Sequence, residues 1–134
     1  MAEKTNKKPK VKIYLSHPFG GSEENREASK AIAAMYRDLW EKEGRNNVIV
    51  NPLELLEGCD EVLPDGTVLN AAIELMSGCD VVIFCDGWQN SEGCKREHYE
   101  ADLLKMECVY IDAEIEAAAK HWYGKHRTIV KRVA

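Results

Sequence analysis

Short apolar runs alternate with amphipathic segments along the chain. Four runs rich in β-branched or aromatic residues predict β-strands, at residues 11–15, 47–52, 79–85 and 108–111. The run at 79–85, CDVVIFC, is apolar over nearly its whole length, which is typical of a strand buried on both faces of a sheet. A further short run, TIV at residues 128–130, is a candidate for an additional edge strand.

Between these runs, apolar residues recur at helical spacing. Helices are predicted over approximately residues 22–44, 67–77, 92–105 and 112–124. Ser22 suits the cap of the first helix and Gly44 its end. The inward faces of the first two helices are predicted to be Ala28, Ile32, Met35, Tyr36 and Leu39, and Leu69, Ala72, Ile73 and Met76. Residues 53–66 predict an irregular segment, with a turn at LPDG, residues 63–66.

Strands that alternate with helices predict a parallel sheet with helices on both of its faces. The expected fold is therefore α/β, a single-domain, three-layer Rossmann- or flavodoxin-like fold with a four- to five-stranded parallel sheet. The chain of 134 residues fits one domain, residues 11–134, after a disordered basic lead at residues 1–10. Ligands of such folds bind beyond the carboxyl ends of the strands. Two loops with unusual residues follow predicted strands, SHPFGG at 16–21 and DGWQNSEG at 86–93.

Composition and charge narrow the class of protein. Hydrophobic residues make up 45% and charged residues 31% of the chain, which is typical of a soluble domain. The net charge of −5 argues against a general nucleic-acid binder, because such a protein has to neutralise many phosphates. No apolar run has the length of a membrane span, and the polar N-terminus does not resemble a signal peptide. We therefore expect a cytoplasmic protein without a nucleic-acid or membrane partner.

The cysteines and histidines give no sign of a metal site. The five cysteines form no CxxC pair, and three of them lie in or beside apolar runs. This pattern favours reduced thiols of a cytosolic protein over disulfides or bound zinc. The four histidines show no metal-ligand spacing, so we expect neither a metal nor another cofactor.

The start of the helix at 92–105 carries the sharpest chemical signal. Ser91 and Gly93 lie at its N-terminal mouth, where backbone N–H groups and the helix dipole favour a phosphate. Glu97 follows one turn later, where a carboxylate could attack a carbon atom beside a bound anion. The simpler interpretation, which spacing alone favours, is that Ser91 caps the helix, Gly93 relieves the turn and Glu97 is solvated.

Other positions also have a structural and a functional interpretation. Asp80, at the start of a strand, most simply accepts hydrogen bonds from turn amides. Tyr14 is either a core residue or places its hydroxyl in the crevice, and Trp88 covers either the sheet edge or a ligand. The Gly20-Gly21 pair lacks the GxGxxG pattern of dinucleotide sites, but it lets a ligand approach the backbone closely.

Several segments together resemble the nucleoside 2-deoxyribosyltransferase-like superfamily. They are KIYLSHPFGG, VNP, CDVVIFCDGWQNSEGCKREHYEA and VYI, and the similarity covers about residues 11 to 111. Its most specific part is residues 79–101, and the chain looks like the small proteins of the DUF4406 type. Related members include nucleoside deoxyribosyltransferases and 2′-deoxynucleoside 5′-monophosphate N-glycosidases.

The resemblance implies roles for the matching residues. Glu97 falls on the nucleophile that attacks the anomeric carbon of the sugar, and Tyr14 matches the tyrosine of the first strand. Ser91 falls where the N-glycosidases have a serine that binds 5′-phosphate and the transferases an aspartate that suits a free 5′-hydroxyl. The candidate catalytic residues are thus Glu97, Tyr14 and Asp80, and the candidate substrate-binding residues are Ser16, His17, Pro18, Gly20, Gly21, Trp88, Ser91 and Gly93.

Two positions depart from the pattern of the superfamily. Ala72 stands where its members usually have an aspartate that handles the nucleobase and orients the nucleophile. His17 stands where the N-terminal loop usually has a glycine. Because a departing nucleobase needs a proton donor, the loss of the acid is expected to slow that step unless another group substitutes.

The chemistry that the resemblance implies is cleavage of the N-glycosidic bond of a nucleoside or deoxynucleoside 5′-monophosphate. The Glu97 carboxylate would stabilise an oxocarbenium-like state and trap it covalently. One alternative is a nucleoside 2-deoxyribosyltransferase, and another, from a different class, is a catalytically weak nucleotide-binding module. By the same resemblance we expect a small-molecule nucleotide or nucleoside as ligand and a homodimer or higher homo-oligomer.

Overall fold

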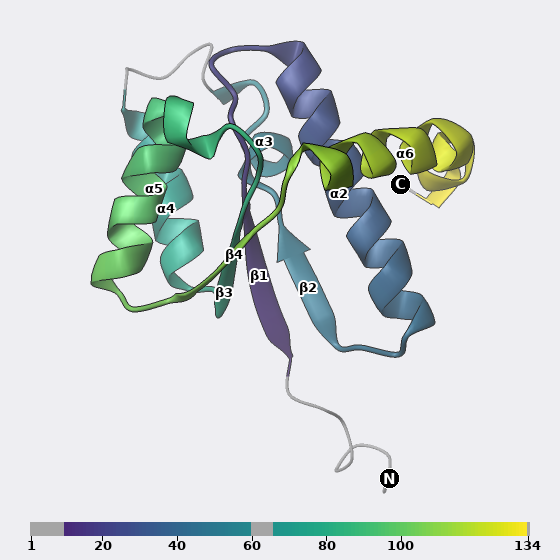
Figure 1. Ribbon diagram of the computed structural model, residues 1–134, viewed down its shortest axis with the longest axis horizontal. Helices are drawn as coiled ribbons and strands as arrows, with labels where there is room; N and C mark the ends of the chain where they lie inside the picture. The colour runs from purple at the N-terminus through teal and green to yellow at the C-terminus, as the bar shows by residue number, and fades with distance from the viewer. Residues whose placement is uncertain (1–9, 60–65, 134) are drawn as a thin grey trace, which may run out of the picture.

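The computed structural model of the protein describes residues 10–59 and 66–133, with side chains through residue 126 (Figure 1). The strands are β1 (Val11–Ser16), β2 (Asn47–Val50), β3 (Val81–Phe84) and β4 (Glu107–Tyr110). The helices are α2 (Glu23–Lys42), α3 (Pro52–Leu55), α4 (Thr67–Ser77), α5 (Glu92–Leu103) and α6 (Ala113–Val133), with a 3-10 turn η2 (Trp88–Asn90). The predicted basic lead, except for Lys10, lies outside the described residues.

The four strands form one parallel sheet in the order β2-β1-β3-β4. Ile13 of β1 pairs with Ile49 of β2 on one side and with Val81 of β3 on the other. The chain runs from β1 outward to β2 and then crosses back to β3 on the opposite side of β1. The predicted single-domain α/β fold with a parallel sheet is therefore confirmed, and the strand order reverses between β1 and β3.

Successive residues of β1 point to opposite faces of the sheet and supply two separate cores. Figure 1 shows α2 and α6 on one face of the sheet and α4 and α5 on the other. Ile13 and Leu15 belong to the first core, with buried residues of α2 and Ala119 of α6. Tyr14 belongs to the second core, with Ala72 of α4 and others. This alternation decides that Tyr14 faces the side on which α5 begins.

The predicted inward face of α2 is correct except near its end. Ser22 caps this helix by accepting a hydrogen bond from the amide of Asn25, at 3.1 Å. Leu39 was expected to be buried, but 42% of it is exposed. Trp40, the next residue round the helix, is buried instead and stacks on Tyr36 with ring centroids 5.1 Å apart. Trp40 therefore supplies the buried core residue near the end of this helix.

Two predicted elements differ from the structure. Residues 128–130, predicted as an edge strand, belong to α6, which also continues past the predicted end at residue 124. The β-branched residues of TIV favour a strand only weakly, and the surrounding helix overrides that preference. Residues 53–66 were predicted to be irregular, but they include most of α3, whose cap Asn51 accepts from the amide of Leu53. The predicted turn at 63–66 lies outside the described residues except for Gly66.

Candidate functional site

A pocket of about 210 Å³ opens beyond the carboxyl end of β1, beside the N-terminus of α5. Its walls come from the loop after β1, from the segment around α3, from α4 and from the first turns of α5. The lining residues are His17, Phe19, Gly20, Pro52, Leu53, Leu56, Val68, Leu69, Ala72, Ser91, Gly93, Cys94 and Glu97. The polar groups lie mainly at the α5 end, whereas α3 and α4 contribute an apolar wall.

Glu97 is the buried carboxyl group of this pocket, with only 6% of the residue exposed. The Tyr14 hydroxyl donates to Oε2 of Glu97 at 2.5 Å, and the Ser16 hydroxyl donates to Oε1 at 2.6 Å. Tyr14 and Ser16 lie two residues apart on β1, so their side chains share one face of the sheet. The end of the strand thus presents one donor to each oxygen of the carboxylate.

Burial governs the protonation of this group of side chains. Burial raises the pKa of Glu97 above its ordinary value, and the hydrogen bonds from Ser16 and Tyr14 oppose that rise. Burial also raises the pKa of Tyr14 well above its usual value, and the negative charge of Glu97 adds to the rise. Tyr14 therefore keeps its proton and remains a donor, while Glu97 is a more basic carboxylate than an exposed one.

The start of α5 has the geometry of a capped helix. Ser91 Oγ accepts a hydrogen bond from the amide of Cys94 at 3.2 Å. Gly93 follows in the first turn and also lines the pocket. The first N–H groups of a helix have no partner within the helix, and together with the dipole they favour an anion. Ser91 and Gly93 both line the pocket, and Ser91 also caps α5 as the simpler interpretation of the sequence expected.

His17 joins the pocket to the last helix. Its Nδ1 lies 2.7 Å from the carbonyl oxygen of Pro18, and its Nε2 lies 2.9 Å from Oε1 of Glu116 on α6. Both partners are acceptors, so both nitrogens donate only in the imidazolium form. The hydrogen bond from His17 is the main cause that lowers the pKa of Glu116. The pair ties the loop after β1 to α6.

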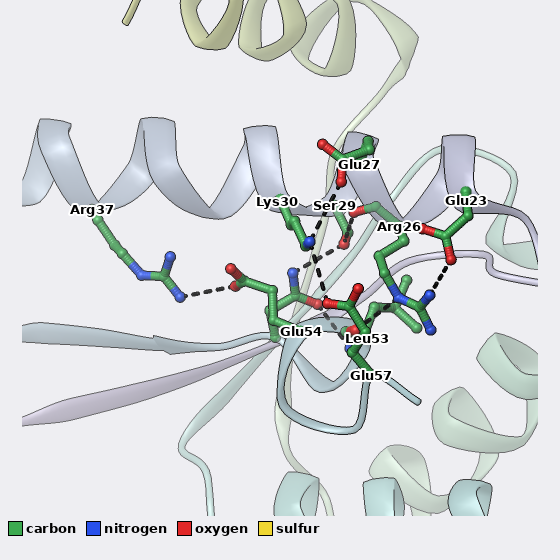
Figure 2. A network of polar contacts seen from close by, with 10 residues as sticks. Glu23, Arg26, Glu27, Ser29, Lys30, Arg37, Leu53, Glu54 and Glu57 are labelled. Atoms are coloured by element: carbon green, nitrogen blue, oxygen red, sulfur yellow. Dashed lines mark hydrogen bonds and ion pairs between the residues drawn. The ribbon is translucent and has the colours of Figure 1, made fainter. Parts of the chain in front are cut away.

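The apolar wall is held in place by polar contacts behind it. Figure 2 shows how side chains of α2 reach the segment from Leu53 to Glu57. Arg26, which is 4% exposed, donates from Nε to the carbonyl oxygen of Leu53 at 3.1 Å and pairs with Glu23. Its guanidinium also lies 4.6 Å from the centre of the Phe19 ring. Phe19 and Leu53 line the pocket, so Arg26 fixes two parts of its wall at once.

Some predicted site residues lie elsewhere. Asp80 is at the amino end of β3, at the opposite end of the strand from the pocket, where its carboxylate accepts from the amide of Lys12 at 2.8 Å. Trp88 stacks on His98 with ring centroids 4.2 Å apart and is not among the lining residues. Pro18 and Gly21 belong to the loop after β1 but do not line the pocket either.

Other lining residues were not identified as site residues from the sequence. Cys94 is 2% exposed, and it lies beside Ser91 and Glu97. The apolar lining residues other than Ala72 are Phe19, Pro52, Leu53, Leu56, Val68 and Leu69. Two signals pointed to this wall: the inward face predicted for α4 included Leu69 and Ala72, and the loop singled out at residues 16–21 includes Phe19. Within residues 10–59 and 66–133 there is no group of three His, Cys, Asp or Glu residues placed to hold a metal ion.

Comparison with known proteins identifies a family without an assigned activity. The model of the DUF4406 family, described as a domain of unknown function, matches residues 11–110. No curated protein and no solved structure matches the chain. Of the helices that the structure describes, none has the length and apolar character needed to cross a membrane.

Proposed function

The chain belongs to the DUF4406 family, whose description assigns no activity, and we propose that it cleaves the N-glycosidic bond of a nucleoside or deoxynucleoside 5′-monophosphate. The observation that carries the proposal is the carboxyl group of Glu97, which is buried at the pocket with a hydroxyl donor on each oxygen. A carboxylate so held can attack the anomeric carbon of a sugar or stabilise the positive charge that develops there.

In the first step of the proposed reaction, a Glu97 oxygen bonds to the anomeric carbon as the bond from that carbon to the base nitrogen breaks. The base leaves with the bonding electron pair and takes up a proton. Water then attacks the anomeric carbon, the ester to Glu97 breaks, and the carboxylate is regenerated while a proton passes to solvent. The products are free base and sugar phosphate. Among the described lining residues Glu97 is the one carboxyl group, and in this scheme the base takes its proton from solvent water.

The two ends of the pocket suit the two ends of such a substrate. Ser91 and the first turn of α5 offer a hydroxyl and helix N–H groups to the 5′-phosphate. The wall formed by Phe19, Leu53 and Leu69 offers apolar surface to a planar base. A phosphate preference is further supported by the resemblance, in which a serine at this position belongs to the N-glycosidases.

Ala72 favours a second candidate from another class, a nucleotide-binding module with weak catalysis. It lines the pocket, and it stands where the resembled superfamily usually has an acid. A nucleoside 2-deoxyribosyltransferase is the alternative within the enzyme class. Assembly into a homodimer or larger homo-oligomer and a cytoplasmic location stay proposals that rest on the resemblance and the composition. Light scattering of the purified protein tests the assembly.

The test of the proposed function is product analysis by chromatography. Pure protein is incubated with ribo- and deoxynucleosides and their 5′-monophosphates, and we expect free base and sugar phosphate from the monophosphates alone. A base exchanged between two nucleosides would instead identify a transferase. Binding of monophosphates without any release of base would identify the binding module.

Glu97→Ala is expected to reduce turnover by at least about 1,000-fold, because it removes the group that forms the covalent bond. Glu100→Ala is the matched control on the same helix, since Glu100 pairs with Arg96 and does not line the pocket. Affinity for monophosphates, measured by calorimetry, should persist in both variants. Turnover of Glu97→Ala equal to that of the unchanged protein would remove Glu97 from the mechanism.

A further inference from the structure

Ser16 contacts the carboxyl group of Glu97 and does not line the pocket. It was expected to bind substrate, yet its side chain is fully buried and it is not among the lining residues. Its hydroxyl donates to Oε1 of Glu97 at 2.6 Å. We propose that Ser16 is a positioning residue, which fixes the orientation of the Glu97 carboxylate and, as a hydrogen-bond donor, favours its ionised form. The inference rests on the proposed function only where it concerns turnover.

The geometry shows why a second donor matters. Tyr14 holds only Oε2, and a carboxyl group held at one oxygen can still turn about that contact. Ser16 holds the other oxygen, so the plane of the carboxylate is defined by two contacts from one strand. The backbone of Ser16 is itself anchored, because its carbonyl oxygen accepts from the amide of Cys85 at 2.9 Å. Two donors on one strand thus fix the position of the carboxylate. The attack of a Glu97 oxygen on the anomeric carbon depends on such positioning.

The electrostatic argument points the same way. Burial disfavours the ionised form of Glu97, whereas a hydrogen-bond donor favours it. Bonds from a hydroxyl to a carboxylate are short and strong, as the 2.6 Å contact is. Removal of the Ser16 hydroxyl leaves the burial unchanged and takes away one of the two stabilising donors. The carboxyl group should then hold its proton to a higher pH.

The test is a titration of Glu97 that needs no substrate. Protein labelled with ¹³C at the glutamate carboxyl carbon is titrated by NMR, and the Glu97 signal is assigned by its loss in Glu97→Gln. In Ser16→Ala we expect the midpoint of this signal to rise by about one pH unit, as the loss of a donor to a buried carboxylate implies. The acid limb of the pH profile of kcat/KM should move to higher pH by the same amount.

Two variants make the test specific. Cys85→Ala is the matched control, because it also removes one buried atom but lies in the core on the other face of the sheet. Its Glu97 midpoint should equal that of the unchanged protein. Ser16→Thr keeps a hydroxyl, so its Glu97 midpoint should lie close to that of the unchanged protein.

An unchanged Glu97 midpoint in Ser16→Ala would overturn the inference, whether or not the protein turns over a nucleotide. A midpoint that rises equally in Cys85→Ala would also overturn it, because the cause would then be general loosening of the core. A shift confined to Ser16→Ala in a protein that releases no base would support the role of Ser16 in holding Glu97. That result would count against the proposed function alone.

Discussion

At the scale of single residues, two opposing effects set the pKa of Glu97: desolvation raises it and hydrogen bonds lower it. Full burial can raise the pKa of a carboxyl group by as much as about 3 to 5 units, and donors to the ionised form act against that rise. The structure supplies two such donors, yet the pKa of Glu97 remains raised because burial is the larger effect. A group of this kind destabilises the folded protein when it ionises, which is a common property of functional sites.

Glu97 should therefore make the stability of the protein fall as pH rises. Its folded pKa lies above the ordinary value of 4.5, so between these values the folded state binds more protons than the unfolded state. Its contribution is fully present below pH 4.5 and is lost as pH rises through the raised pKa. The loss amounts to about 1.4 kcal/mol for each unit by which the pKa is raised.

Glu97→Gln removes the titratable group. Urea unfolding of both proteins between pH 4 and pH 8 measures how the free energy of unfolding depends on pH. We expect the free energy of unfolding of the unchanged protein, minus that of Glu97→Gln, to decline above pH 4.5 and then level off. Glu100→Gln, a change on the same helix outside the pocket, should leave that pH dependence in place. If the difference in the free energy of unfolding between the unchanged protein and Glu97→Gln stays constant across this range, the pKa of Glu97 is not raised in the folded protein.

At the scale of elements, the N-terminus of α5 combines a structural and a proposed chemical role. Ser91 caps the helix through the amide of Cys94, and it lines the pocket at the same time. Of the two interpretations of the Ser91 and Gly93 pattern, the structure shows the helix cap, and the phosphate site stays a prediction that is compatible with it. The cap uses the Ser91 oxygen as an acceptor, whereas a phosphate would accept the hydroxyl proton, so a substitution that keeps only one of these functions is informative.

Ser91→Ala and Ser91→Asp separate these two roles. Ser91→Ala loses the cap and should lower the free energy of unfolding by about 1 kcal/mol, whereas Ser91→Asp retains a capping oxygen and should lower it much less. Both should weaken binding of 5′-monophosphates, and Ser91→Asp more strongly, because its carboxylate repels the phosphate. Urea unfolding and calorimetric titration with monophosphates measure the two effects. Equal monophosphate affinity in all three proteins would show that Ser91 does not contact the phosphate.

At the scale of the whole molecule, α6 completes a domain whose family match ends before it. The DUF4406 model matches residues 11–110, but Ala119 of α6 is fully buried in the core formed with β1 and α2. Through the bond from His17 to Glu116, the same helix also holds the loop after β1 that lines the pocket. Helix α6 therefore belongs to the folding unit and supports the site from behind.

A charge introduced at Ala119 should disrupt this packing. Ala119→Glu places a larger, ionisable side chain in a fully buried position, and we expect a loss of about 3 kcal/mol or more in the free energy of unfolding. Ala118→Glu is the matched control, because the neighbouring residue on the same helix is exposed and glutamate is a good helix former. Urea unfolding of the two variants provides the comparison. Equal stability of the two would mean that α6 does not pack on the sheet as described.

The sequence by itself determined the class of fold and the position of most elements. Apolar runs and helical spacing predicted the four strands, and α4 was predicted at its observed bounds, residues 67–77. These signals are local, because the side chains of a strand or helix repeat with the period of their own backbone. The two loops at carboxyl ends of strands could also be identified, and residues of both meet at the pocket. That they meet follows from the parallel order of the strands.

Only the tertiary structure decided which of the candidate residues lie in contact. Glu97 is 83 positions from Tyr14 and 81 from Ser16 in sequence, yet both hydroxyls contact its carboxylate. Asp80 lies at the other end of β3, although it was a candidate catalytic residue together with Glu97 and Tyr14. These relations depend on which strands are neighbours and on which face of β1 is covered by α5. Local periodicity carries no information about either, since both are set by how the helices pack on the two faces of the sheet.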